Sequence, residues 1–259
     1  MLEKEDYEEF CSCIAKREKS IPVYRILEKL DGYFIEKEFD NAERLLMYWL
    51  GEAQSISDDT GRLLLLNECI GFYRKLGKGE KATEYSKEAI SFSARVCDEV
   101  MKGTTYLNAA TAFKAFGKTD DALELYSKAQ NIYEKNLNAD DSRLAGLYNN
   151  MATAVLDKND FDRAEKLFLS ALKIMKKGEN TQAEQAITYC NLADLVSKKT
   201  GTKNDAKIKD YLENARELLL SEKTPAIAYA CEKCEDVFKY YGFNEYAGEL
   251  SKRAKYERN

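Results

Sequence analysis

The sequence predicts an all-α protein made of stacked helix hairpins. Three observations lead to this prediction: 33% of the 259 residues are charged, only two residues are proline, and an alanine-centred pattern recurs about every forty residues. So many charged side chains suit long solvated helices, whereas sandwiches and barrels need frequent turn residues. The apolar content of 44% is enough to bury a substantial core.

The repeat is defined by an anchor residue, which is alanine in five of six repeats. Seven positions after the anchor a second alanine follows in five repeats, and nine positions before it stands a large apolar residue in five repeats. In the fifth repeat Val196 takes this place if its longer loop is allowed for. Small side chains let two helices approach to about 8–10 Å, and the large side chains would fill the remaining space. The anchors are Ala42, Ala82, Ala122, Ala164, Ile208 and Ala247, and the large residues are Tyr33, Tyr73, Phe113, Val155, Val196 and Phe238.

A turn signal lies five residues before the anchor in four repeats. Glycine, and less readily asparagine, tolerates the left-handed conformation that ends a helix, so each repeat is predicted to be a helix hairpin. Two helix starts are also marked, because Thr224 before Pro225 and Asp160 before the second helix of the fourth repeat are typical N-caps. The turn residues are Gly77, Gly117, Asn159 and Gly242.

We expect six repeats, at about 22–58, 59–100, 101–139, 140–179, 180–223 and 224–259. Their first helices are predicted at about 22–37, 60–76, 103–116, 142–158, 182–199 and 225–241. Their second helices are predicted at about 40–55, 79–99, 119–136, 160–177, 205–221 and 243–257. Residues 1–21 are expected to form an N-terminal capping helix, because an apolar stripe over residues 3–18 could cover the open end of the first hairpin.

The repeats resemble a known family. The third repeat carries the tetratricopeptide pattern, and the longer period resembles the forty-two-residue form of kinesin light chains, most clearly from Leu137 to Lys177 and in the repeat before it. The resemblance spans residues 22–257 and implies a right-handed α-α superhelix, a TPR solenoid. The residues that carry the pattern are Tyr106, Ala109, Ala110, Phe113, Gly117, Ala122, Tyr126 and Ala129.

Asparagines on the predicted first helices are the main candidate binding residues. Asn108, Asn150 and Asn191 occupy one column of the repeat, and Asn67 and Asn149 occupy the column just before it. Asparagine is a mediocre helix residue, but its carboxamide can pair with both the N–H and the C=O of an extended peptide. In the family that the repeats resemble, such asparagines line a concave groove. The alternative is that these amides bond neighbouring helices or face water.

Charged residues follow the asparagines on the same predicted face. Arg74, Lys114 and Asp194 are the candidates for contacts with a peptide, because a mixed-charge groove could select partners by electrostatic complementarity. A merely solvated face is the alternative for each of them. The lysine and asparagine arrangement with which chaperone-binding relatives hold a C-terminal carboxylate is not evident.

Composition excludes several other functions. The net charge of −5 argues against binding to nucleic acid or to a membrane surface, and no apolar run approaches membrane-spanning length. Seven cysteines, mostly inside apolar helical patterns, suggest reduced thiols in a cytoplasmic protein. The pairs Cys11/Cys13 and Cys231/Cys234 have metal-site spacing, but they lie at opposite ends of a solenoid, so no metal or other cofactor is expected.

The sequence therefore predicts a protein-binding or peptide-binding scaffold that is not an enzyme, and a homo-oligomer is left open. The absence of histidine removes the commonest general base, and no phosphate-binding glycine loop occurs. One alternative is a peptide-sensing regulatory protein whose superhelix pitch changes when ligand binds. Another is a carboxylate-dependent enzyme, which would require a pocket enclosing several acidic side chains with raised pKa.

Overall fold

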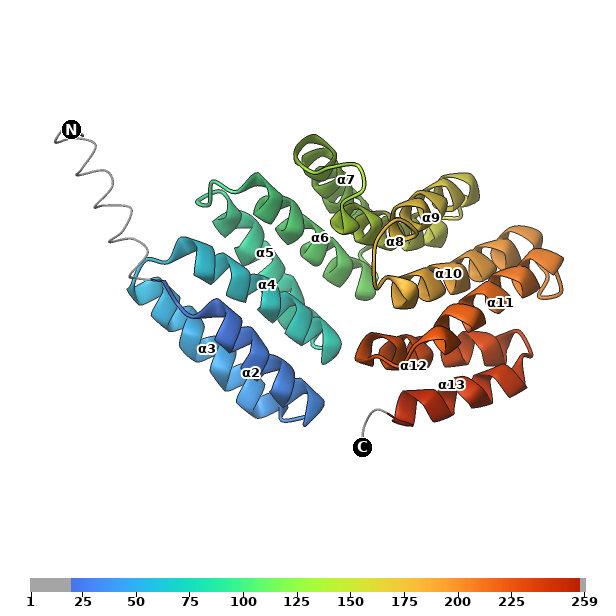
Figure 1. Cartoon of the computed structure of the whole chain (residues 1–259). Helices are drawn as coiled ribbons and strands as arrows, with labels where there is room; N and C mark the ends of the chain where they lie inside the picture. Colours follow the sequence, from blue (N-terminus) through green and yellow to red (C-terminus); the bar gives the residue numbers. More distant parts are fainter. Residues whose placement is uncertain (1–19, 257–259) are drawn as a thin grey trace, which may run out of the picture. The chain divides into compact units, whose positions relative to one another are not determined.

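The computed structural model describes residues 20–256, and these residues form twelve α-helices and no β-strand (Figure 1). The all-α prediction is confirmed. The first helices of the six repeats are α2 (Val23–Ile35), α4 (Asp59–Lys75), α6 (Glu99–Ala115), α8 (Ser142–Asp157), α10 (Gln182–Thr200) and α12 (Pro225–Tyr240). The second helices are α3 (Phe39–Ser55), α5 (Gly79–Ser93), α7 (Thr119–Asn136), α9 (Phe161–Met175), α11 (Ala206–Ser221) and α13 (Asn244–Tyr256).

The helix boundaries agree with the predicted ones except between α5 and α6. We expected one helix to reach residue 99 and the next to begin at 103, but α5 ends at Ser93 and α6 begins at Glu99. The reason is a cap that the pattern did not reveal, because the side chain of Asp98 accepts a hydrogen bond from the N–H of Met101 at 2.9 Å. Val96, in the connection between the two helices, is buried and holds this segment against the core.

The predicted turn residues all adopt the left-handed backbone conformation. Gly77, Gly117 and Gly242 have φ angles of 69°, 78° and 84°, and Asn159 has a φ of 61°. After Gly117, the N–H of the next residue returns to the carbonyl oxygen of Phe113 at 2.9 Å, which satisfies one of the last free carbonyls of α6. Contacts of this kind end the first helices of these four repeats and direct the chain into the second ones.

The predicted anchors form the centre of the core. The alanine anchors Ala42, Ala82, Ala122 and Ala164 are 0% exposed, and Ile208 and Ala247 are 1% exposed. The large residues that precede them, with Tyr73 and Phe238 as examples, are buried in all but the first repeat, where Tyr33 is half-buried. Small and large side chains therefore interlock between paired helices, as the period predicts.

Both predicted helix caps are present. The hydroxyl of Thr224 accepts a hydrogen bond from the N–H of Ile227 at 3.2 Å, with Pro225 in the first turn. The carboxylate of Asp160 accepts one from the N–H of Arg163 at 3.2 Å. Each cap satisfies an N–H group that has no partner inside its own helix.

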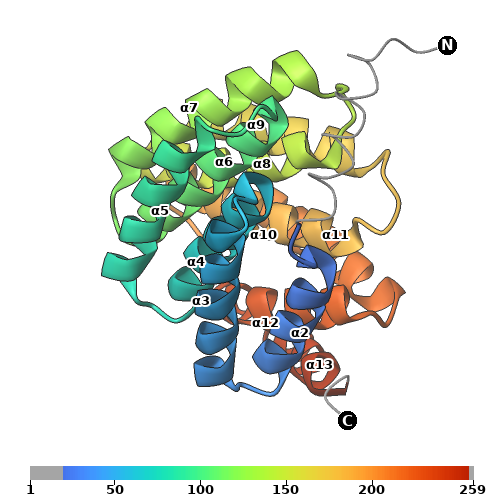
Figure 2. The ribbon, with the colours of Figure 1, turned by 90° about the vertical axis from the view of Figure 1, so that its left-hand side faces the viewer.

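The chain divides into two compact units, and the boundary between Leu125 and Tyr126 falls inside α7. In the N-terminal unit α4 contacts both α2 and α6, while Figures 1 and 2 show α2 and α3 side by side. In the C-terminal unit α10 contacts both α8 and α12. Within each unit the first helices thus form one continuous layer, whose solvent side we call the first-helix face.

A polar contact links the first two repeats. The carboxylate of Glu43 on α3 accepts hydrogen bonds from Lys81 at 2.7 Å and from the hydroxyl of Tyr73 at 2.8 Å. These two hydrogen bonds hold the pKa of Glu43 below its usual value.

The expected N-terminal capping helix lies outside the described residues except for Ser20 and Ile21. The N–H of Ile21 donates to Asp58 at 2.9 Å, and its side chain is buried. None of the helices between residues 20 and 256 is long and apolar enough to cross a membrane.

Candidate functional site

The N-terminal unit contains an amide contact between α4 and α6. The side chain of Asn67, which is 6% exposed, donates to the carbonyl oxygen of Leu63 at 2.9 Å and to the hydroxyl of Thr105 at 3.0 Å. Its own oxygen accepts a hydrogen bond from the Nδ2 of Asn108 at 3.0 Å. We call this cluster of Asn67, Thr105 and Asn108 the first amide rung.

The C-terminal unit has a similar arrangement between α8 and α10, in which the threonine donates to the asparagine instead of accepting from it. The Oδ1 of Asn149 accepts hydrogen bonds from the hydroxyl of Thr188 at 3.0 Å and from the Nδ2 of Asn191 at 3.2 Å. Thr188 is fully buried and lies three residues before Asn191, just as Thr105 lies three residues before Asn108. We call Asn149, Thr188 and Asn191 the second amide rung.

The two columns of asparagine therefore bond each other across neighbouring first helices. The interpretation in which the amides join helices describes Asn67 and Asn149, whose oxygens are occupied. Asn108 and Asn191 are half-buried and use one N–H each in the rungs. The carboxamide of Asn150 is also half-buried and makes no hydrogen bond with residues 20–256, so the side-chain oxygens of Asn108, Asn150 and Asn191 accept none from the described residues.

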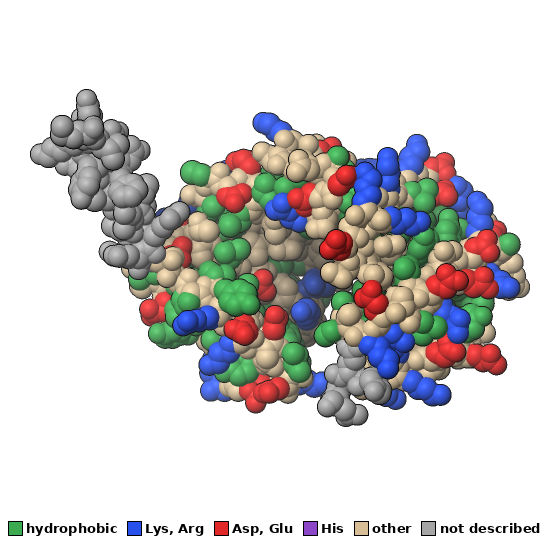
Figure 3. Space-filling model, viewed as in Figure 1, with side chains coloured by type: hydrophobic (Ala, Val, Ile, Leu, Met, Phe, Trp, Pro, Cys, Tyr) green, Lys and Arg blue, Asp and Glu red, His purple; other side chains and the backbone are tan. Residues whose placement is uncertain are grey.

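The predicted basic residues lie at the ends of their helices. Arg74 and Lys114 are half-buried in the last turns of α4 and α6, where a positive charge faces the carbonyl end of the helix dipole. This placement gives both residues a favourable helix-end interaction. Acidic and basic side chains are interspersed over the surface in Figure 3, in agreement with the mixed-charge pattern of the sequence.

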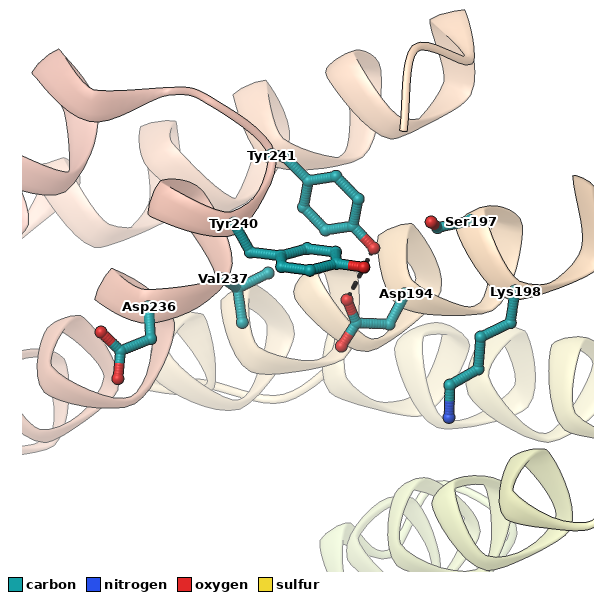
Figure 4. Close-up of a pocket in the computed structure, with 7 residues that line it drawn as sticks. All are labelled: Asp194, Ser197, Lys198, Asp236, Val237, Tyr240 and Tyr241. Atoms are coloured by element: carbon teal, nitrogen blue, oxygen red, sulfur yellow. Dashed lines mark hydrogen bonds between the residues drawn. The ribbon is translucent and has the colours of Figure 1, made fainter. Parts of the chain in front are cut away.

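Asp194 lies in a pocket of about 350 Å³ between α10 and α12 (Figure 4). Its Oδ1 accepts a hydrogen bond from the hydroxyl of Tyr241 at 2.8 Å. Burial raises the pKa of Asp194, and burial together with this hydrogen bond raises the pKa of Tyr241. The other lining residues are Ser197, Lys198, Asp236, Val237 and Tyr240.

The acidic residues of the pocket do not converge. The side chain of Asp236 is 92% exposed and extends away from Asp194 in Figure 4. The pocket therefore holds one partly buried carboxylate beside two tyrosines, and not the paired carboxylates that acid–base catalysis would use.

Four of the five cysteines that the structure describes pack in the core. Cys190 on α10 lies in hydrogen-bonding contact with Cys234 on α12, and this contact, followed by burial, raises the pKa of the Cys190 thiol. Cys231 is buried as well, and Cys97 is exposed. Within the part of the chain that the structure describes, no three Cys, Asp or Glu side chains are placed to share a metal ion, and Cys11 and Cys13 lie outside that part.

Sequence reasoning missed the threonines of the rungs and the tyrosines of the pocket. A signal for the threonines existed, because Thr105/Asn108 and Thr188/Asn191 recur at the same spacing on two first helices. For the pocket, the sequence offered only a weak signal, the Tyr240–Tyr241 pair before the turn glycine. Its shape depends on contacts between helices whose residues are more than forty positions apart.

Comparison with known proteins identifies the class. Family models described as tetratricopeptide repeat match residues 62–135 and 144–178. Over these residues the chain carries tetratricopeptide repeats, and the predicted resemblance is confirmed. No curated protein sequence matches it.

Solved structures of low sequence identity share the fold. BtubC (BKLC) from P. vanneervenii is 19% identical with a TM-score of 0.53, over 91% of both chains. The apo form of RapI is 14% identical with a TM-score of 0.68, over 94% of this chain and 64% of RapI. NprR in complex with its cognate peptide NprX is 14% identical with a TM-score of 0.59, over 98% of this chain and 73% of NprR. These similarities establish the solenoid fold.

Proposed function

We propose that this protein is a scaffold that holds an extended segment of a partner protein along its first-helix face. The observation that carries the proposal is the repeated amide rung, which leaves the oxygens of Asn108 and Asn191 without a hydrogen bond to the described residues. Each rung fixes the orientation of the carboxamide of Asn108 or Asn191, because one N–H of that carboxamide is hydrogen-bonded within the rung. A carboxamide held in this way can accept from a backbone N–H and donate to a backbone C=O, whatever side chains the segment carries.

The spacing of the helices suits an extended segment. Asn150 on α8 and Asn191 on α10 lie on adjacent first helices, and packed helices are about 8–10 Å apart. An extended chain advances about 3.3 Å per residue, so neighbouring amides would meet its backbone about three residues apart. The fold comparison agrees with this use, because NprR is described with a bound peptide and a Rap protein with competence and sporulation factor.

The test replaces Asn150 and Asn191, whose side-chain oxygens accept no hydrogen bond from the described residues, and leaves Asn67 and Asn149 in place. Asn150→Ala with Asn191→Ala should weaken binding of a peptide selected from a random heptapeptide library by at least about tenfold, as expected for two lost hydrogen bonds. The matched control is Asn214→Ala, since Asn214 lies on α11 and bonds only the carbonyl of Asp210, at 2.7 Å in its own helix. Equal affinity of the double variant and the control would overturn the amide assignment.

A second candidate is a peptide-sensing regulator. NprR is described as a quorum sensor and is known in both an apo form and a peptide complex, and its fold resembles this chain. In such a protein the selected peptide would change the pitch of the superhelix. Small-angle scattering at saturating peptide distinguishes the two functions, because a scaffold should give an unchanged profile and a sensor a shifted one.

A further inference from the structure

The pocket of Asp194 lies on the same stripe of α10 as the second amide rung. Asn191, Asp194 and Lys198 are spaced by three and four residues, so their side chains share one face of the helix. A segment that crosses α10 at Asn191 would therefore run about one helical turn (about 5.4 Å) from the pocket, within reach of one of its long side chains. Because of this proximity, the inference below rests on the proposed function.

The polar group in the pocket is a half-satisfied carboxylate. Tyr241 donates to one oxygen of Asp194, but no donor from residues 20–256 reaches the other oxygen. A partly buried carboxylate with an open acceptor is stabilised by a ligand that brings a hydrogen-bond donor, above all a charged one.

The lysines around the pocket are held by other carboxylates. Lys198 lies 3.8 Å from Asp157 on α8, and Lys239 lies 2.6 Å from Glu235 on its own helix. Lys198 is near enough to act on the pKa of Asp194 and lowers it, but neither lysine forms an ion pair with Asp194 within the described residues. The open oxygen of Asp194 is therefore not occupied by either lysine.

The walls of the pocket suit a cation with an apolar stem. The rings of Tyr240 and Tyr241 meet edge to face, with centroids 5.0 Å apart and planes at 85°, and Val237 lies beside them. The ring of Tyr240 already carries one cation, because the Nζ of Lys203 lies 3.4 Å from its centroid. The volume of about 350 Å³ is at the small end of ligand sites, which fits one side chain better than a folded ligand.

We propose that this pocket binds the guanidinium or ammonium group of an arginine or lysine side chain in the bound segment. The cation donates to the open oxygen of Asp194, and its methylene stem packs against Val237 and the tyrosine rings. The second amide rung holds the backbone of any segment, and the pocket then selects segments with a basic residue at one position.

The test compares a charged probe with a neutral one of the same shape. The probes are N-acetylated, fluorescein-labelled heptapeptide pools with arginine or citrulline fixed at the centre and random residues elsewhere, and a third pool has citrulline and a free N-terminus. Fluorescence anisotropy with the full chain should show about tenfold tighter binding of the arginine pool than of the acetylated citrulline pool. If only the pool with the free N-terminus gains affinity, the cation comes from the chain terminus, and the side-chain assignment is overturned.

Asp194→Asn should remove the difference between the arginine and citrulline pools. The asparagine oxygen can still accept from Tyr241, so the variant should fold, and circular dichroism checks this. The matched control is Asp210→Asn, on the exposed surface of α11, which should keep the full difference. Equal binding of both pools to the wild type, or a preference for arginine that survives in Asp194→Asn, would overturn the inference while the proposed function stands. If no pool binds at all, the proposed function fails, and this inference fails with it.

Discussion

Replacing Asn67 with alanine tests whether the amide rung stabilises the N-terminal unit. The side chain of Asn67 makes three hydrogen bonds, and two of them join α4 to Thr105 and Asn108 on α6. A typical hydrogen bond contributes a net of about 1 kcal/mol, so the two interhelical bonds account for about 2 kcal/mol. Truncating a side chain that is 6% exposed also leaves a small void, which brings the expected cost to about 2–3 kcal/mol.

The stability lost in Asn67→Ala should not reach the larger values seen when a buried polar group is left without any hydrogen-bond partner. The hydroxyl of Thr105 keeps its hydrogen bond to the carbonyl oxygen of Met101 at 3.0 Å. Asn108 is half-buried, and water can replace its lost partner. The variant therefore leaves no buried donor unsatisfied. For this reason we expect a loss of stability of about 2–3 kcal/mol and not one of about 4–5 kcal/mol.

Urea unfolding followed by circular dichroism measures the difference. Asn214→Ala is the control, and it should change the free energy of unfolding by less than about 0.5 kcal/mol, as is usual for an exposed position. A double-mutant cycle of Asn67→Ala with Asn108→Ala should give a coupling of about 1 kcal/mol. The reasoning is refuted if Asn67→Ala costs no more than the control, or if the two substitutions are additive.

Three further predictions concern turns, charge and thiols. Gly117→Ala should lower stability by about 1 kcal/mol, because the φ of Gly117 is 78°. Gly71→Ala should raise stability by about 0.5–1 kcal/mol, because Gly71 lies inside α4 and no atom lies within 4 Å of the new Cβ. Melting temperatures of the two variants that shift in the same direction would contradict this. Glu43→Gln should be less stable than wild type near neutral pH. This difference in stability should disappear as the pH falls through the lowered pKa of Glu43, since the hydrogen-bonded carboxylate is then protonated. A stability difference of equal size at about pH 3 would count against it. Cys97 should react with iodoacetamide in the native protein, while Cys69, whose pKa burial raises, should react only after unfolding, as site-resolved mass spectrometry can show.

The hairpins could be predicted from the sequence because each carries its own local signal. Glycine or asparagine at the turn gave the end of a first helix, and Gly117 and Asn159 indeed have positive φ. The first repeat shows the limit of this signal, because Lys37 adopts a φ of 59° without glycine. That turn closes with the same backbone hydrogen bond as the glycine turns, from the N–H of Glu38 to the carbonyl oxygen of Tyr33 at 2.8 Å, so its conformation cannot be read from the residue type alone.

The candidate site could be predicted only in part, for a related reason. The columns of asparagine follow from the period, so Asn108 and Asn191 could be aligned without a structure. Which atoms they meet depends on the stagger of neighbouring helices, and this stagger brings Asn67 opposite Thr105 and Asn108. A period measured along the sequence has no information on that offset between helices.

The two interpretations of the asparagines are compatible because a carboxamide has more hydrogen-bonding positions than a rung uses. Asn191 gives one N–H to Asn149 and keeps its oxygen and second N–H for other partners. The same contact that joins α8 to α10 thus orients the group that we propose binds a partner. An exposed amide without such a contact would lose more rotamer entropy on binding, so the rung should lower the cost of holding a peptide. Substitution of Asn149, which would contact no peptide in this arrangement, should accordingly weaken binding by freeing Asn191.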